Sequence, residues 1–175
     1  MTKIKNIHKM IDKEIKNLIN LTDLDIYNNY NLTNNGIQHL TRLTHLNLYN
    51  NKKITDKGIK HLKNLTHLNL YDNCSITDDG IKHLTNLTHL NIGYFGNNKY
   101  NITDNGIKHL IRLTHLNLGC YKNSDHITDE GIKHLTNLTE LILGLNIKVT
   151  SEGIKHLTNL TKLTLDCNRQ ITNKG

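Results

Sequence analysis

The chain of 175 residues has no proline, tryptophan or alanine and a single phenylalanine, whereas asparagine occurs 27 times. No apolar run reaches the roughly 20 residues that a membrane-spanning helix needs, and the first twenty residues have no apolar core of the kind found in signal peptides. Three cysteines, Cys74, Cys120 and Cys167, are odd in number and widely spaced, which disfavours a disulfide framework or a zinc ribbon. These absences predict no membrane association and a cytoplasmic location, the host cytoplasm if the source is a virus or an intracellular microbe.

Motifs for catalysis are also missing. The sequence has no HExxH, GxSxG or P-loop motif and no pair of carboxylates at catalytic spacing, and Cys120 has no evident histidine and acid partners. We therefore expect no enzymatic activity, no cofactor and no metal. Leucine and isoleucine are frequent enough to form a core, so the chain is expected to fold as one unit.

A repeat organises the chain. The segment GIKHL, or GIQHL in its first copy, recurs in steps of 22 to 26 residues. Self-similarity at such a period indicates a solenoid, in which small units stack because none can bury its apolar face alone. The glycines that mark the register are Gly36, Gly58, Gly80, Gly106, Gly131, Gly153 and Gly175.

Each repeat contains two apolar rhythms. The pattern LxxLxL, as at Leu65 to Leu70, ends with the period of two of a short strand. The spacing of Ile59 and Leu62 places one apolar stripe on a short helix, and a threonine followed by a short polar residue, as at Thr55, provides a helix cap. Strands joined by helical crossovers run parallel, so we expect a curved sheet with helices outside and a polar inner face.

The segment LTHLNLYDNCSITDDGIKHLTN, at 65–86, resembles the leucine-rich repeat, closest to the cysteine-containing class of F-box proteins. Seven such copies cover residues 21 to 175, although no F-box is visible. The resemblance implies an α/β leucine-rich-repeat solenoid of about seven repeats of 22 to 26 residues, with a concave sheet and convex helices. Asparagine replaces the usual cysteine, and its side chain is expected to bond the backbone of the turn between repeats. These positions are Asn29, Asn51, Asn73, Asn146 and Asn168.

The two ends differ from the central repeats. Residues 1–20 place isoleucines at helical spacing from Ile4 to Ile15, which predicts a capping helix or degenerate repeat. A basic helix that binds a membrane surface or a partner is the alternative. The repeat domain, 21–175, shows no C-terminal cap. The chain is then either a fragment of a longer array, or its last strand is covered by a partner or by self-association.

Side chains between the apolar strand positions are predicted to face the concave surface in columns. Four histidines in one column are most simply a polar contact surface. The alternatives are a metal site, disfavoured because no carboxylate or cysteine is in register, and a pH-responsive surface. The predicted concave partner-binding residues are His45, His67, His89, His115, Asn47, Asn69, Asn91 and Asn117.

Aromatic residues fall at the last strand position or in the loop after it. Two longer repeats enlarge this loop, and clustered aromatics in adjacent loops are typical of contact hot spots, although two of them could instead fill gaps in the asparagine column. The predicted rim residues for partner binding are Tyr27, Tyr49, Tyr71, Tyr94, Phe95, Tyr100 and Tyr121.

The helices carry histidine and lysine, as at His61 and Lys60, on an expected convex face. The chain has 22 basic and 15 acidic residues and a net charge of +7. This face, however, has no interleaved aromatics, and nearby aspartates dilute its positive charge, so nucleic-acid binding is not expected.

The sequence predicts a non-catalytic module that binds a protein through its concave face and rim. The resemblance implies one alternative, a substrate-recognition arm in ubiquitin-ligase assembly; a metal- or pH-responsive histidine surface is another.

Overall fold

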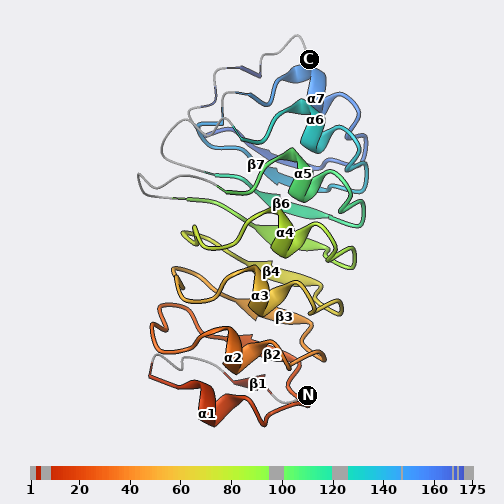
Figure 1. Cartoon of the computed structure of the whole chain (residues 1–175). Coiled ribbons are helices and arrows are strands. Elements are labelled where there is room, and N and C mark those ends of the chain that lie inside the picture. The colour runs from red at the N-terminus through yellow and green to blue at the C-terminus, as the bar shows by residue number, and fades with distance from the viewer. Residues whose placement is uncertain are drawn as a thin grey trace.

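The computed structural model describes residues 3–4, 9–94, 101–119, 126–146, 148–166, 168 and 170–171, with side chains from residue 9 onward. Strands and helices alternate along the chain in short units (Figure 1). Among the described residues, no helix has the length and apolarity to cross a bilayer. The strands are β1 (Lys3–Ile4), β2 (Asp23–Asp25), β3 (His45–Asn47), β4 (His67–Asn69), β5 (His89–Asn91), β6 (His115–Asn117), β7 (Glu140–Ile142) and β8 (Lys162–Thr164). The helices are α1 (Asp12–Ile15), α2 (Asn34–Ile37), α3 (Asp56–Ile59), α4 (Asp78–Ile81), α5 (Asp104–Ile107), α6 (Asp129–Ile132) and α7 (Ser151–Ile154).

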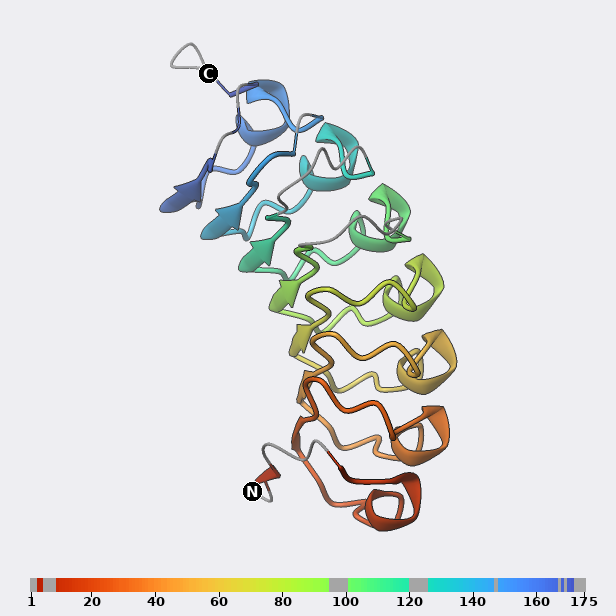
Figure 2. The same cartoon turned by 90° about the vertical axis from the view of Figure 1, so that its left-hand side faces the viewer.

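All eight strands form one parallel sheet in chain order. Figure 2 shows the resulting arc, with the strands on the concave side and the helices on the convex side. Register is exact from repeat to repeat, since His45 pairs with His67 and Asn47 with Asn69. The predicted leucine-rich-repeat solenoid is confirmed, with β1 as one strand beyond the seven expected.

The core lies between the sheet and the helices and runs the length of the arc. In one repeat, Leu65, Leu68 and Leu70 are at most 2% exposed, as are Ile59 and Leu62. The helices are shorter than the apolar spacing suggests. For example, α3 ends at Ile59, and Leu62 lies just after the turn that follows the helix. Leu62 is nevertheless buried, because the turn keeps it over the same apolar stripe.

The N-terminal segment contains one short strand and one short helix. Lys3 and Ile4 pair as a strand with Asp23 and Leu24, and only Asp12–Ile15 is helical. Backbone pairing with β2 satisfies polar groups that a helix over the same residues would leave exposed at the sheet edge. This strand and helix occupy the places of the strand and helix of a repeat, and residues 5–8 lie outside the described part.

The asparagine column joins each turn to the preceding repeat. Asn51 is fully buried, its Nδ2 donates to the backbone oxygen of Asn29 at 2.7 Å, and its Oδ1 accepts from the backbone N–H of Ile54 at 3.3 Å. Asn73 and Asn146 bond their own turns and the preceding repeats in the same way. The predicted structural role of this column is therefore confirmed.

A second connection between repeats was not anticipated from the sequence. The Asp56 carboxylate, expected only to support its own helix, accepts from the backbone N–H of Thr77 at 2.8 Å and from the Thr77 hydroxyl at 2.7 Å. The same hydroxyl accepts from the N–H of Asp79 at 3.2 Å, so Thr77 caps α4 as predicted. The glycine column follows from this contact: a Cβ at Gly58 would lie 2.6 Å from Oδ1 of Asn34, the equivalent residue one repeat earlier.

We predict that Asn51→Ala lowers the free energy of unfolding by about 1–3 kcal/mol, because the carbonyl of Asn29 and the N–H of Ile54 lose a buried partner. Urea denaturation followed by circular dichroism measures the change. Asn35→Ala is the matched control, since Asn35 is exposed, and it is expected to stay within about 0.5 kcal/mol of wild type. Equal losses in both variants would contradict the structural role.

Candidate functional site

The centre of the concave face is a stack of four imidazole rings. His45, His67, His89 and His115 are the first residues of β3 to β6, so the parallel register sets them one above another. Their ring centroids are 4.1, 4.0 and 4.0 Å apart, with interplanar angles of 19°, 14° and 12°. The four predicted histidines therefore form one continuous stack, the histidine stack.

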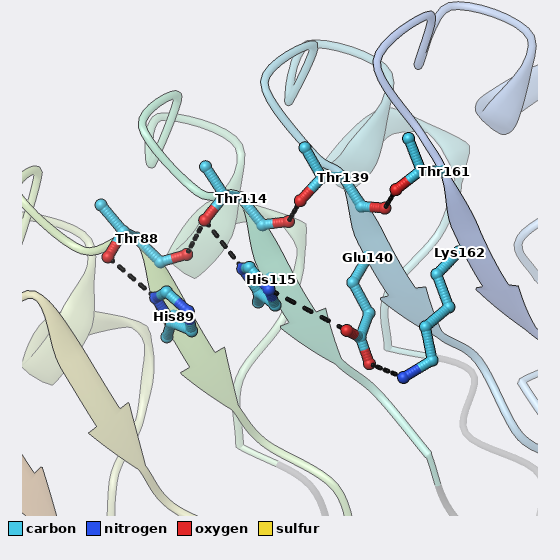
Figure 3. A network of polar contacts seen from close by, with 8 residues as sticks. All are labelled: Thr88, His89, Thr114, His115, Thr139, Glu140, Thr161 and Lys162. Carbon is cyan, nitrogen blue, oxygen red and sulfur yellow. Dashed lines mark hydrogen bonds and ion pairs between the residues drawn. The ribbon is translucent and has the colours of Figure 1, made fainter.

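A threonine column behind the histidine stack fixes its orientation. The Thr88 hydroxyl donates to the backbone oxygen of Thr66 at 3.1 Å and lies 2.9 Å from Nδ1 of His89. Since its hydrogen is already used, the hydroxyl accepts from Nδ1–H of the ring. In the neutral ring this leaves Nε2 as an acceptor. Figure 3 shows the arrangement continuing at Thr114 and His115.

Sequence reasoning missed this threonine column, although its signal is present. A threonine directly precedes each concave histidine, and equivalent threonines directly precede the strands that have no histidine. Each hydroxyl from Thr44 onward donates to the backbone of the preceding threonine at 3.0–3.1 Å. The column comprises Thr22, Thr44, Thr66, Thr88, Thr114, Thr139 and Thr161.

Acidic groups stand at both ends of the histidine stack. Oδ1 of Asp23 lies 3.7 Å from Nδ1 of His45, and Oε2 of Glu140 lies 3.9 Å from Nε2 of His115. Glu140 also pairs with Lys162 at 2.8 Å (Figure 3), and this hydrogen bond lowers the pKa of Glu140. In the sheet register, Lys3 is the partner of Asp23.

Inner rings of the stack resist protonation. Partial burial lowers the pKa of His67 from its usual 6.5 to about 4, with further contributions from His89, His45 and His115. Burial also lowers the pKa of His89, and repulsion by His115 adds to this. Adjacent imidazolium rings about 4 Å apart would repel each other, so the inner rings are neutral at pH 7.

The asparagine residues of the strands form a parallel row of donors. Oδ1 of Asn69 accepts from the N–H of Tyr71 at 2.9 Å, and Asn91 and Asn117 bond Gly93 and Gly119 equivalently. This contact uses the amide oxygen and turns Nδ2 toward the groove. Asn47 differs, because its Nδ2 donates to Oδ1 of Asp25 at 3.0 Å.

Histidines and asparagines together line a groove of about 460 Å³ that follows the concave face from β2 to β7. Parallel rings direct their Nε2 atoms side by side and not toward one point, which is poor geometry for a shared metal ion. Within the ranges the structure describes, no group of three or more histidine, cysteine or acidic side chains could hold a metal. The groove therefore offers hydrogen bonds and charge.

The rim beside the groove contains a short tyrosine ladder. The rings of Tyr49 and Tyr71 stack with centroids 5.3 Å apart. Gly93 ends the ladder, because a Cβ there would lie 2.9 Å from the Tyr71 ring. Tyr27 is partly exposed at the other end, whereas Tyr94 is only 7% exposed and offers little contact area.

Three predicted rim residues, Phe95, Tyr100 and Tyr121, lie outside the described residues. On the convex face the histidine column is exposed as expected, including His61 and His83. Some convex lysines pair with acids three residues earlier in the chain, which reduces the positive charge of this face. These ion pairs are Lys82 with Asp79, Lys133 with Glu130 and Lys155 with Glu152.

Comparisons with known proteins support the fold. A family model described as Leucine Rich repeat matches residues 39–63 and 61–84, and no curated protein sequence matches the chain. Similar solved structures include internalin C2 of Listeria monocytogenes, with 24% identity, TM-score 0.65, and 97% of this chain and 67% of that chain covered. A leucine-rich-repeat protein of Leptospira interrogans has 28% identity and TM-score 0.60, covering 85% of this chain and 38% of that one.

The yeast Rad7–Elc1 complex also contains a similar chain, with 22% identity, TM-score 0.63, and coverage of 87% of this chain and 44% of that one. The chain thus spans less than half of the Leptospira and yeast chains and two thirds of the internalin. The fold is therefore that of a leucine-rich-repeat solenoid, and the family model matches part of it, residues 39–84.

We predict that acid destabilises the folded chain through the histidine stack. His67 has a folded-state pKa of about 4, below the 6.5 of the unfolded chain. The unfolded state therefore binds this proton first, so the stability present above about pH 6.5 is lost as pH falls toward 4. His67→Asn should reduce the fall in melting temperature between pH 7 and pH 4, measured by circular dichroism.

The matched control is His61→Asn, which removes an exposed histidine from the convex face and should retain the wild-type pH dependence. The same fall in wild type and His67→Asn would contradict a contribution from the stack.

Proposed function

We propose that the chain is a non-catalytic module that binds a protein partner through its concave groove and tyrosine rim. The observation that carries the proposal is the fixed orientation of the groove side chains. Thr88 holds His89, and Asn69 is held by the backbone N–H of Tyr71. Binding to a surface that is already ordered loses little side-chain entropy, which favours recognition of a folded or extended protein segment.

The fold supports this class of function, since leucine-rich-repeat solenoids offer a long concave surface for contact. Rad7, seen with Elc1 in yeast, is an example of a similar fold in a complex. A role as a substrate-recognition arm in ubiquitin-ligase assembly is a narrower version of this proposal. It rests on the resemblance to F-box proteins, and the described groove contains no feature that favours it.

A pH-responsive surface is the second candidate. Its specific support is the stack of four rings between Asp23 and Glu140, in which the inner rings of His67 and His89 have lowered pKa values. Acidification would convert Nε2 acceptors into charged donors and would change which partners the groove accepts. This role is compatible with protein binding, because it alters the chemistry of the same groove.

Site-directed crosslinking tests the proposed binding face. A photoreactive phenylalanine analogue at Asn91, on the concave face, should give crosslinked protein adducts in lysate of the cells that produce the chain. The same analogue at His83, exposed on the convex face, is the matched control and should give few. Light scattering of the free chain identifies adducts that arise from self-association.

Two double variants then test which aromatic residues contribute to the interface. Tyr49→Ser with Tyr71→Ser should weaken the adduct at Asn91 if the rim contributes, because stacked tyrosines supply contact area at low entropic cost. Phe95→Ser with Tyr121→Ser tests two of the predicted rim residues that lie outside the described part of the chain. Equal crosslinking at Asn91 and His83 would reject the concave face as the binding site.

A further inference from the structure

The groove and the rest of the chain differ in charge. The chain carries a net charge of +7, yet the charged residues that line the groove are all acidic: Asp23, Asp25 and Glu140. The inner histidines are neutral at pH 7, as their lowered pKa values indicate. A low-dielectric groove concentrates the field of such groups, so it repels polyanions and attracts cations.

The hydrogen-bonding groups of the histidine column also favour a cationic ligand, because they accept hydrogen bonds. Each ring donates Nδ1–H to a threonine, so the Nε2 atoms of the stack are acceptors in the neutral state. Asp25 uses Oδ1 to accept from Asn47 and Tyr27, which leaves Oδ2 for another donor. The column of rings and the acids at its ends therefore suit a ligand rich in N–H donors.

We propose that the groove binds an extended segment of a protein partner with lysine or arginine near both ends, one cation lying against Asp23 and Asp25 and the other against Glu140. Side-chain and backbone N–H groups between the cations donate to the histidine stack, and carbonyl groups accept from the asparagine row. This inference rests on the proposed function and specifies the chemistry of the partner.

The dimensions of the sheet define the segment. Five strand-to-strand steps separate β2 from β7, and at about 4.8 Å each they place Asp23 roughly 24 Å from Glu140. Extended chain advances about 3.4 Å per residue, so about seven residues span this distance.

Other occupants fit less well. A nucleic acid or an acidic peptide would place negative charge against Asp25 and Glu140. A second copy of this chain would offer convex lysines, some of which already pair with Asp79, Glu130 or Glu152. Both alternatives are outcomes of the test below.

The test uses a displayed library of random nine-residue peptides, selected on the full chain at pH 7.5. Enriched peptides should carry a surplus of lysine and arginine, with two cations about seven residues apart. Their affinity, measured by fluorescence anisotropy, should fall about five-fold or more in the double variant Asp25→Asn with Glu140→Gln. The control, Asp79→Asn with Glu130→Gln, removes the same charge from the convex side and should leave affinity near wild type.

Blocking the groove separates this inference from the proposed function. Asn91→Arg places a bulky cation in the groove and should abolish binding, with circular dichroism confirming the fold. Neutral or acidic peptides that are lost with Asn91→Arg would overturn the cationic partner but retain the groove. Peptides unaffected by Asn91→Arg, equal losses in the charge variant and its control, or no enrichment would each overturn the inference.

Discussion

The lateral hydrogen bond between a side chain of one repeat and the backbone of a neighbouring repeat is the interaction on which this structure depends. A strand of three residues and a helix of four are too short to be stable alone, and each turn leaves backbone groups that the core cannot satisfy. Asn51, Asp56 and Thr66 each bond a neighbouring repeat, at the turn, the helix start and the strand start. Three columns of short polar side chains therefore hold the leucine core in register.

The same interaction also orders the side chains of the concave groove. A threonine hydroxyl that donates backward to the sheet accepts from a histidine, so the bond that joins two repeats also sets the tautomer of a groove residue. Stacking at 4.0 Å then follows from strand register and not from any special sequence at the site. The bonds that join repeats and the side chains that line the groove share the strand ends, so the groove side chains are ordered in the free chain.

Much of this architecture could be predicted from the sequence, since strict periodicity gave the sheet, the concave columns and the bonding role of Asn51. Features that depend on contacts between repeats could not. Asp56 was expected to serve its own helix, because nothing in a single repeat shows that its carboxylate contacts Thr77. Likewise, the strand at Lys3 pairs with Asp23, and the backbone N–H of Tyr94 bonds Gly119, both 20 or more residues away. Asp25 and Glu140 are also far apart in the sequence, and only the folded sheet places both carboxylates in one groove.

The direction of the threonine column has a consequence for how such a chain can change over evolutionary time. Beside each ring of the histidine stack, the threonine hydroxyl points its hydrogen toward the repeat before it and presents a lone pair to the ring; these threonines are Thr44, Thr66, Thr88 and Thr114. An internal duplication of one whole repeat would therefore supply each new donor with an acceptor and each old acceptor with a donor. The number of repeats can therefore change without a new kind of contact between repeats, and each added copy of a histidine-bearing repeat lengthens the concave surface by one ring and one amide.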